Sequence, residues 1–218
     1  MTSGPGKLLV ATRSAGKMRE IRRILADIPN LEVLSLDDAG VAEAPEEEGL
    51  EPYDTFEENA RSKAAYFFRK TGIPTVADDS GIVVDALDGA PGVRSKRFAP
   101  AELAEGRGQD EANNRYLVER LRGVDAADRT ARYVCVAVML DGRTDETGIV
   151  TRGTAEGRVV DEPRGDGGFG YDPHVLVPEL GRTFAELSAE EKDGRSHRGE
   201  AFRALASVLL RRVDDARG

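Results

Sequence analysis

Residues 76–86 read VADDSGIVVDA, in which two carboxylates, a hydroxyl and a glycine (78–81) separate two apolar segments. Burying charge is costly unless the charge is paired or holds a metal ion. Adjacent side chains of a strand point to opposite faces, so we expect two short strands, 75–77 and 82–84, with the carboxylates where the first one ends. A carboxylate at the end of a strand suits a magnesium ligand or a general base, although a plain polar turn fits this stretch equally well.

Helix and strand patterns alternate before this stretch. Residues 8–12 form a short apolar run typical of a buried strand, and apolar side chains at helical spacing predict a helix over about 16–26. Residues 31–36 alternate as a strand does, and a long acidic loop follows. The capping box at 55–58 predicts a helix that ends near Lys70, where a glycine and a proline follow.

A hairpin dominates the chain after this stretch. Asp110 is predicted to cap a helix, and residues 131–140 and 147–154 are predicted strands joined by a short turn. A C-terminal helix is predicted to start near Ser196. Alternating strands and helices followed by a hairpin indicate an α/β fold with a mixed sheet, and the absence of any linker indicates one domain over residues 1–218.

Composition excludes several classes of partner. The 218 residues carry 40 acidic and 31 basic side chains, a net charge of -9, so nucleic acid and membrane surfaces are disfavoured as partners. Cys135 is the single cysteine and lies in an apolar run, so we interpret it as a small buried hydrophobe. No membrane-spanning run or signal peptide is evident, which leads us to expect a cytoplasmic location.

A strand-to-helix turn at residues 12–17, TRSAGK, offers groups that suit a phosphate. Hydroxyls and backbone amides at a helix N-terminus attract anions, and Lys17 adds a positive charge. The spacing is not that of a P-loop. An ordinary N-cap at Ser14 with an exposed Lys17 is the simpler interpretation of this turn alone.

Two later segments complete the set. Residues 165–173, GDGGFGYDP, combine glycines that let backbone approach a ligand with Phe169, which can stack on a base; Asp172 can accept hydrogen bonds from a purine edge. A glycine-rich loop with one core aromatic is the alternative. In residues 192–198, KDGRSHR, the cations His197 and Arg198 fall in the first turn of a helix, where they oppose its dipole unless an anion binds. Together these segments indicate a nucleotide with its phosphates, and magnesium.

The combination of these motifs resembles the inosine triphosphate pyrophosphatase family. The resemblance runs in order from about Leu8 to Leu209. Its motifs are Thr12-x4-Lys17, TFEENARSKA (55–64), ADDSG (77–81), GAPGV (89–93), GFGYDP (168–173) and SHR (196–198). It implies a long mixed sheet with flanking helices, two lobes around a central cleft and a homodimer. It also implies magnesium-dependent hydrolysis of ITP, dITP or XTP to the monophosphate and pyrophosphate.

The resemblance also implies roles for single residues. Asp79 would be the catalytic base and a magnesium ligand, and Glu46 a second ligand, with Glu47 and Glu48 as adjacent alternatives. Serine stands at position 14 where the family commonly has asparagine, and Arg13 beside it would compensate. The phosphate side would be lined by Thr12, Arg13, Ser14, Ala15, Gly16, Lys17, Lys63 and Ser80. The nucleotide would be held by Phe169, Gly170, Tyr171, Asp172, Lys192, His197 and Arg198.

Base choice would rest on the six-oxo group that inosine and xanthine carry and adenine lacks, with His197 and Arg198 as candidate donors. Two alternatives stay open at this stage. One is a nucleotide-binding sensor without turnover. The other is a related hydrolase for other nucleotides, such as modified pyrimidine triphosphates.

Overall fold

The computed structural model describes residues 6–106, 108–142 and 148–215. The chain divides into two compact units. Unit 1 comprises Met1–Asp79, Cys135–Gly153 and Arg198–Gly218, and unit 2 comprises Ser80–Val134 and Thr154–His197. The assignment of residues 1–218 to one domain stays a prediction.

Within the described residues, seven strands form a sheet with the order β2-β1-β3-β4-β5-β6-β7. Strand β1 pairs in parallel with β2 and β3, whereas β6 is antiparallel to β5 and β7. The predicted α/β fold with a mixed sheet is therefore confirmed. The strands are β1 Gly6–Val10, β2 Leu31–Leu34, β3 Thr75–Val84, β4 Thr130–Leu140, β5 Ile149–Val159, β6 Val175–Val177 and β7 Arg182–Thr183.

The helices flank these strands. They are α1 Ala15–Leu25, α2 Phe56–Thr71, α3 Ala101–Ala104, α4 Gln109–Arg120, α5 Ala189–Arg195 and α6 His197–Asp215. The predicted N-cap at Thr55 is confirmed: its hydroxyl accepts a hydrogen bond from the Glu58 amide and donates one to the Glu58 carboxylate, which reaches back as predicted. Gly72 then ends α2 with a φ of 68°, a left-handed conformation that favours glycine. Short 3-10 helices lie in the connections, among them η1 Pro45–Gly49 and η3 Gly92–Arg97.

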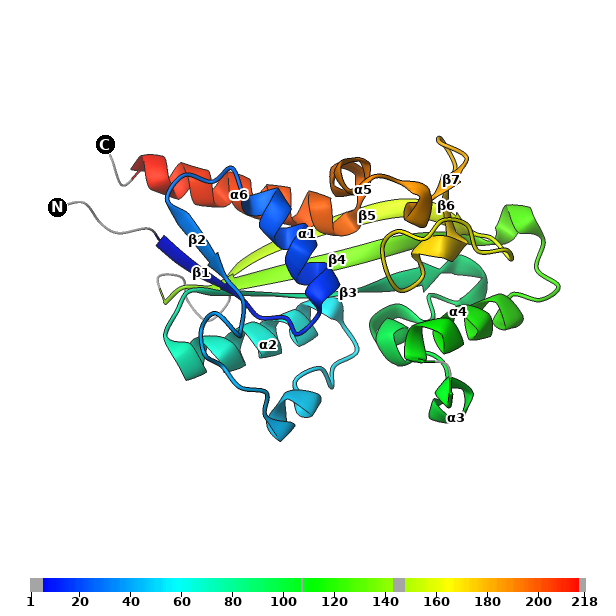
Figure 1. The fold of residues 1–218 in the computed structure, drawn as a ribbon, viewed down its shortest axis with the longest axis horizontal. Helices are drawn as coiled ribbons and strands as arrows, with labels where there is room; N and C mark the ends of the chain where they lie inside the picture. Colours follow the sequence, from blue (N-terminus) through cyan, green and yellow to red (C-terminus); the bar gives the residue numbers. More distant parts are fainter. Residues whose placement is uncertain (1–5, 107, 143–147, 216–218) are drawn as a thin grey trace. The chain divides into compact units, whose positions relative to one another are not determined.

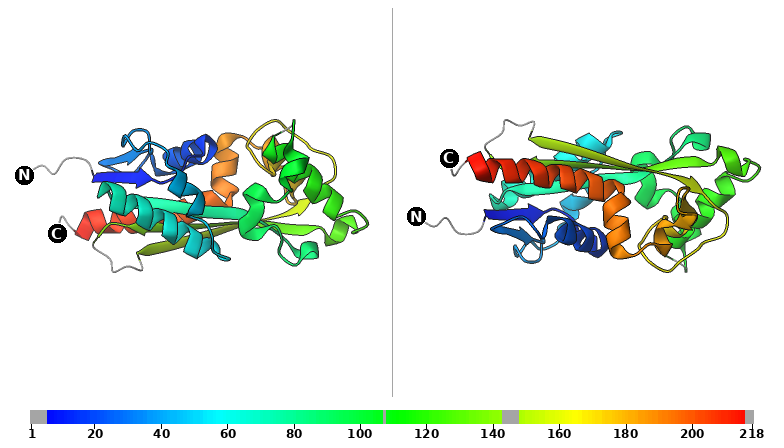
Figure 2. Two further views of the ribbon diagram at one scale, coloured as in Figure 1. Left: turned by 90° about the horizontal axis from the view of Figure 1, so that it is seen from below. Right: turned by 90° about the horizontal axis from the view of Figure 1, so that it is seen from above.

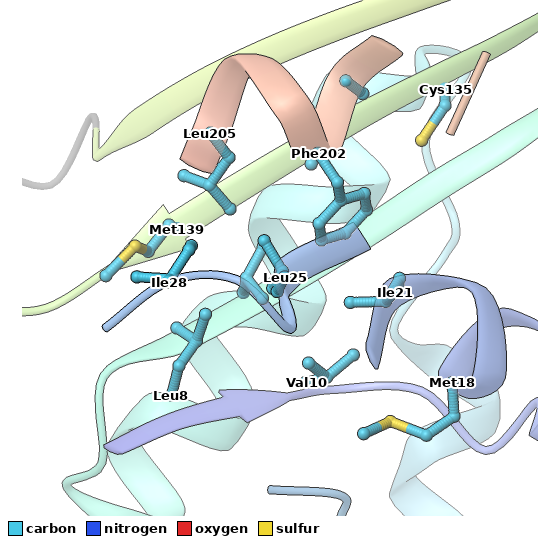
Figure 3. Packing of buried hydrophobic residues seen from close by; sticks show 13 residues of the cluster. Leu8, Val10, Met18, Ile21, Leu25, Ile28, Cys135, Met139, Phe202 and Leu205 are labelled. Atoms are coloured by element: carbon cyan, nitrogen blue, oxygen red, sulfur yellow. The ribbon is translucent and has the colours of Figure 1, made fainter. Parts of the chain in front are cut away.

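Unit 1 is built around the parallel strands. Helices α1 and α6 lie over one face of its strands and α2 over the other (Figures 1 and 2). Figure 3 shows how Leu8 of β1, Ile21 of α1 and Phe202 of α6 point into one cluster of buried apolar side chains, with Cys135 at its edge. Burial raises the pKa of the Cys135 thiol well above its usual range, which confirms the interpretation of this residue as an inert core side chain.

Unit 2 has a core of its own. It contains Leu117 of α4, Tyr133 of β4, Val175 of β6 and Phe184, and the rings of Tyr133 and Phe184 meet edge to face with centroids 5.3 Å apart. Such aromatic pairs fix ring orientation as well as burying area. This core holds the short antiparallel strands β6 and β7 beside the end of β5.

The structure corrects the prediction for residues 75–84. They form one strand, β3, with no break at Asp78 and Asp79. Gly81 makes this possible, because a Cβ there would lie 2.3 Å from both the Gly92 carbonyl oxygen and the Ser95 hydroxyl. That hydroxyl accepts a hydrogen bond from the amide of Ile82, so the strand passes a fixed polar partner at close range.

Two other predictions change. Gly108, not Asp110, is the N-cap of α4, and the Asp110 carboxylate instead accepts a hydrogen bond from the amide of Gly170. The predicted hairpin strands correspond to β4 and β5, while residues 143–147 between them lie outside the described residues.

Candidate active site

The two aspartates of β3 have different surroundings, as expected for neighbours on an unbroken strand. Asp78 Oδ2 lies 3.0 Å from Lys17 Nζ and 3.3 Å from Arg198 Nη2. Asp79 Oδ2 instead accepts a hydrogen bond of 3.0 Å from the Asn59 side-chain amide of α2. These contacts of the two buried carboxylates therefore involve different side chains.

Asp78 is an ionised carboxylate at the centre of positive charge. Burial alone would raise its pKa, but the nearby Lys17 and Arg198 charges hold the pKa of Asp78 far below its usual range. Its Oδ1 atom is buried and accepts no hydrogen bond from the described residues. Asp78 thus fixes two cations and keeps one acceptor for water or a ligand donor.

The turn before α1 has the features of an anion site. Ser14 is the N-cap, accepting a hydrogen bond of 3.3 Å from the Lys17 amide, and the Thr12 hydroxyl accepts one of 3.2 Å from the Ser14 amide. The first turn of α1 contains no acidic residue, so its positive dipole end is not offset locally. The Lys17 side chain is only 18 % exposed, unlike the exposed lysine of the simpler interpretation.

A second group of charges surrounds Asp79. Lys63 Nζ donates a hydrogen bond of 2.5 Å to the Asp78 carbonyl oxygen and also pairs with the Glu51 carboxylate. Burial raises the pKa of Asp79 above its usual value, with the Glu51 charge adding to the effect and Lys63 and Lys17 opposing it. The opposite balance applies to Glu51, where burial is outweighed by the Lys63 charge and the pKa falls.

The acidic segment before α2 places its glutamates unequally. Glu46 and Glu48 are exposed in η1, and Glu47 forms an ion pair with Arg13. Glu51, two residues after η1, is the glutamate whose charge acts on Asp79. Within the described residues no three His, Cys, Asp or Glu side chains gather as a metal-binding group. Magnesium commonly needs only one or two carboxylates, with substrate phosphates and water completing its shell.

The glycine-rich loop of unit 2 is organised by Asp172. Its Oδ2 accepts hydrogen bonds from Lys192 Nζ at 2.6 Å and from the Phe169 amide at 2.8 Å, and its Oδ1 accepts one from the Tyr133 hydroxyl. Lys192 Nζ also lies 4.7 Å from the centroid of the Phe169 ring. Both carboxylate oxygens of Asp172 therefore already accept hydrogen bonds from residues of unit 2. Contact of Asp172 with a purine edge stays a prediction.

Two glycines of this loop are tied to their neighbours. A Cβ at Gly168, whose φ is +73°, would lie 2.1 Å from Asp172 Oδ2. Helix α4 binds both backbone polar groups of Gly170: the Asp110 carboxylate accepts a hydrogen bond from its amide, and the Asn114 side chain donates one of 2.9 Å to its carbonyl oxygen. The Phe169 ring is thus carried on a backbone fixed at both ends.

The remaining predicted residues are placed as follows. His197 is buried and stacks on Tyr133 with centroids 4.8 Å apart. Tyr171 is buried in the core of unit 2, where its hydroxyl donates a 2.7 Å hydrogen bond to the Ser95 carbonyl. Ser80, Ala15 and Gly16 adjoin the residues already described, Ser80 being half-buried.

Arg198 is the most buried of the predicted binding residues, with its side chain 2 % exposed. Its Nη1 lies 2.6 Å from Glu20 Oε2, and its Nε and Nη2 face Asp78. The cation at the start of α6 therefore has anions of the chain itself as partners, which weakens the argument that a bound anion is needed there. Direct contact of Arg198 with a nucleotide stays a prediction.

Several residues around the site were not identified from sequence. Asn59 lies in the motif TFEENARSKA (55–64) but was given no role, and its buried side-chain amide donates a hydrogen bond to Asp79. Glu20 follows Lys17 by three residues, a spacing that places both on one side of a helix and was an available signal. Glu51 and Tyr133 gave no signal, because one glutamate among many and one aromatic in a strand have ordinary structural explanations.

Comparison with known proteins identifies the family of this chain. The model of the Ham1 family matches residues 8–208. The chain belongs to the Ham1 family. This confirms the family expected from the motifs.

Relatives of this Ham1-family chain match over nearly its full length. A protein of Nitrosomonas europaea named dITP/XTP pyrophosphatase is 48 % identical over 203 residues, 93 % of this chain and 94 % of that protein. One of the same name from Thermus thermophilus is 45 % identical over 91 % of this chain and 89 % of its own length. The solved structure of a HAM1 protein from Coxiella burnetii has a TM-score of 0.81 at 34 % identity, covering 94 % of this chain and 99 % of that one.

Among the described residues, no helix has the length and apolar character needed to cross a membrane.

Proposed function

We propose that this chain hydrolyses non-standard purine nucleoside triphosphates, such as dITP, ITP and XTP, to the monophosphate and pyrophosphate. The observation that carries the proposal is the buried carboxylate Asp79, surrounded by Lys63, Asn59 and Glu51 and adjacent in β3 to the residue that binds Lys17. A purely structural carboxylate does not require this concentration of charge. The names of the relatives from Nitrosomonas europaea and Thermus thermophilus agree with this activity.

Asp79 is the base of the proposed reaction. A raised pKa makes the Asp79 carboxylate a better proton acceptor than an exposed aspartate. It accepts a proton from the water that attacks the α-phosphorus, and the bond from that phosphorus to the bridging oxygen of pyrophosphate breaks. The Asn59 amide orients the carboxylate by its hydrogen bond to Oδ2.

The phosphates are assigned to the turn before α1. Backbone amides at the N-terminus of this helix, the Thr12 and Ser14 hydroxyls and the Lys17 ammonium all favour negative charge. Because Asp78 holds Lys17 in place, the ammonium needs little reorganisation when charge builds up on the leaving group.

Asp79 and Glu51 are the residues that would hold magnesium. Both are carboxylates, the ligands this ion prefers, and their charges act on each other. Glu46 is exposed, whereas the charge of Glu51 acts on Asp79, so we assign the second magnesium ligand to Glu51 instead of Glu46. The chemistry that magnesium supplies when bound is neutralisation of phosphate charge.

The purine base of the substrate is assigned to the glycine-rich loop of unit 2. The Phe169 ring is held by the Lys192 ammonium and offers an aromatic face for stacking. Lys192 and His197 are candidate donors for the six-oxo group that hypoxanthine and xanthine carry. Adenine would leave such donors without an acceptor, which is the basis for its rejection.

The test is a magnesium-dependent substrate panel. With ITP, dITP, XTP, GTP, ATP and dTTP compared side by side, we expect pyrophosphate release from the first three and none after chelation with EDTA. Binding of ITP without release of pyrophosphate or phosphate would make the chain a sensor. Preference for dTTP or a modified pyrimidine would transfer the activity to another substrate class.

Glu51→Gln and Glu46→Gln form a matched pair for the metal. Since the amide of glutamine is a poor magnesium ligand, we expect Glu51→Gln to raise the magnesium concentration for half-maximal rate by about tenfold or more. Glu46→Gln, an exposed change in the same segment, is expected to leave it unchanged. The reverse pattern would restore Glu46 as the ligand.

The homodimer and the cytoplasmic location expected from the sequence belong to the same proposal. Support for the location is the lone cysteine, which excludes an internal disulfide. Sedimentation of the purified protein would test the dimer.

A further inference from the structure

Arg13, in the turn that precedes α1, binds the acidic segment formed by residues 37–54. Its Nε and Nη2 donate to the two carboxylate oxygens of Glu47 at 2.9 and 2.7 Å, and its Nη1 donates to the Val41 carbonyl at 3.0 Å. Asp37 lies 3.6 Å from the same guanidinium. One side chain thus contacts residues from the start, middle and end of a stretch of eleven residues.

The geometry is that of a strong ion pair. Two parallel bonds from a guanidinium to one carboxylate are more directional than a single contact. The side chains are 27 % and 11 % exposed, so water screens them less than a pair on the open surface. The hydrogen bond to Glu47 raises the pKa of Arg13, and the same bond lowers the pKa of Glu47, so both stay charged at neutral pH.

Glu47 is also part of the local backbone structure. Its Oε1 accepts a hydrogen bond of 3.2 Å from the Ala44 amide, which closes a capping arrangement at the start of η1. Arg13 therefore holds η1 by a residue that itself fixes the beginning of that helix. Glu51 follows the end of η1 by two residues and pairs with Lys63.

These contacts leave Arg13 committed to the chain. From the sequence, Arg13 was expected to compensate for the serine at position 14. Its Nε, Nη1 and Nη2 atoms instead donate to Glu47 and Val41, which leaves few N–H donors for a phosphate. We propose that the Arg13–Glu47 ion pair positions the acidic segment so that Glu51 meets magnesium beside Asp79. Arg13 is in this view a positioning residue for the reaction under "Proposed function", on which the inference rests.

The experiment compares Arg13→Ala with wild type in two readouts. Amide hydrogen exchange of residues 41–51, measured without metal or substrate, is expected to accelerate in the variant, with the amides of α2 unchanged. In the kinetic assay, the magnesium concentration for half-maximal rate is expected to rise about tenfold, the usual effect of losing a partner that orients a ligand. The kcat at saturating magnesium and the melting temperature are expected to change little.

Three further variants make the test specific. Arg22→Ala is the matched control, because it removes an arginine–carboxylate pair from the same segment, at Asp38, and should change neither readout. Glu47→Gln keeps an acceptor for Ala44 but loses the charge, so it should reproduce Arg13→Ala. The double variant should be no worse than either single one, because both remove one interaction. Arg13→Lys should recover part of the magnesium affinity.

The outcomes separate the two proposals. Unchanged exchange and unchanged magnesium dependence in Arg13→Ala would overturn the inference while leaving the hydrolase intact. A raised KM for ITP with normal exchange would also overturn it, because Arg13 would then contact substrate directly. Wild-type protein without turnover refutes the proposed function, and the exchange data then still decide whether Arg13 fixes the segment.

Discussion

Asp79→Asn is expected to lower kcat by about 1,000-fold with ITP and magnesium, within the range that loss of a general base produces. The amide cannot accept a proton from water and is a poorer ligand for a hard cation. The change is otherwise isosteric, and the carbonyl of the new side chain can still accept the hydrogen bond that Asn59 donates. The melting temperature should therefore stay close to that of wild type.

Asp85→Asn supplies the control for this experiment. Asp85 follows the same strand, is exposed, and bonds the Thr130 hydroxyl and the Arg132 guanidinium. We expect normal turnover from it. Substantial activity in Asp79→Asn would remove Asp79 from the chemistry, and a large fall in melting temperature would give it a structural role instead.

Much of the fold followed from periodicity and capping. Helix α2, Phe56–Thr71 in the structure, was predicted to end near Lys70 because Thr55 and Glu58 mark its start and Gly72 its end, and each is a local signal. The break predicted in β3 was wrong because the partners of its polar residues come from elsewhere in the chain. Asp78 is matched by Lys17 and Arg198, which no local pattern around residue 78 reveals.

The candidate site shows the same division. Lys17, Lys63 and Asp79 were identified because motifs of fixed spacing mark them, and the structure gathers them around β3. The sequence offered Glu46, Glu47 and Glu48 as magnesium ligands and did not suggest Glu51, because an acidic run does not encode how far each of its glutamates is buried. Arg13 was expected at a phosphate because the family resemblance carried over the whole turn 12–17, whereas its side chain binds Glu47, 34 residues later.

Arg198→Met is the substitution expected to cost the most stability. It removes the cation that faces Asp78 and Glu20, both buried, and leaves their negative charges without this partner. Breaking a buried ion pair by removing one member typically costs about 3–5 kcal/mol, and methionine fills much of the same volume. We expect a loss of that size in the free energy of unfolding, measured by urea denaturation at neutral pH.

Two companions show whether charge is the cause. Arg211→Met, an exposed change in the same helix α6, should leave the free energy of unfolding within about 0.5 kcal/mol of wild type. Adding Glu20→Gln to Arg198→Met should recover part of the loss, because one of the two carboxylates is then neutral. Arg198→Met could instead keep the wild-type free energy of unfolding and only reduce the preference for ITP over ATP. The guanidinium would then act on the purine base, and its contacts with Asp78 and Glu20 would contribute little to stability.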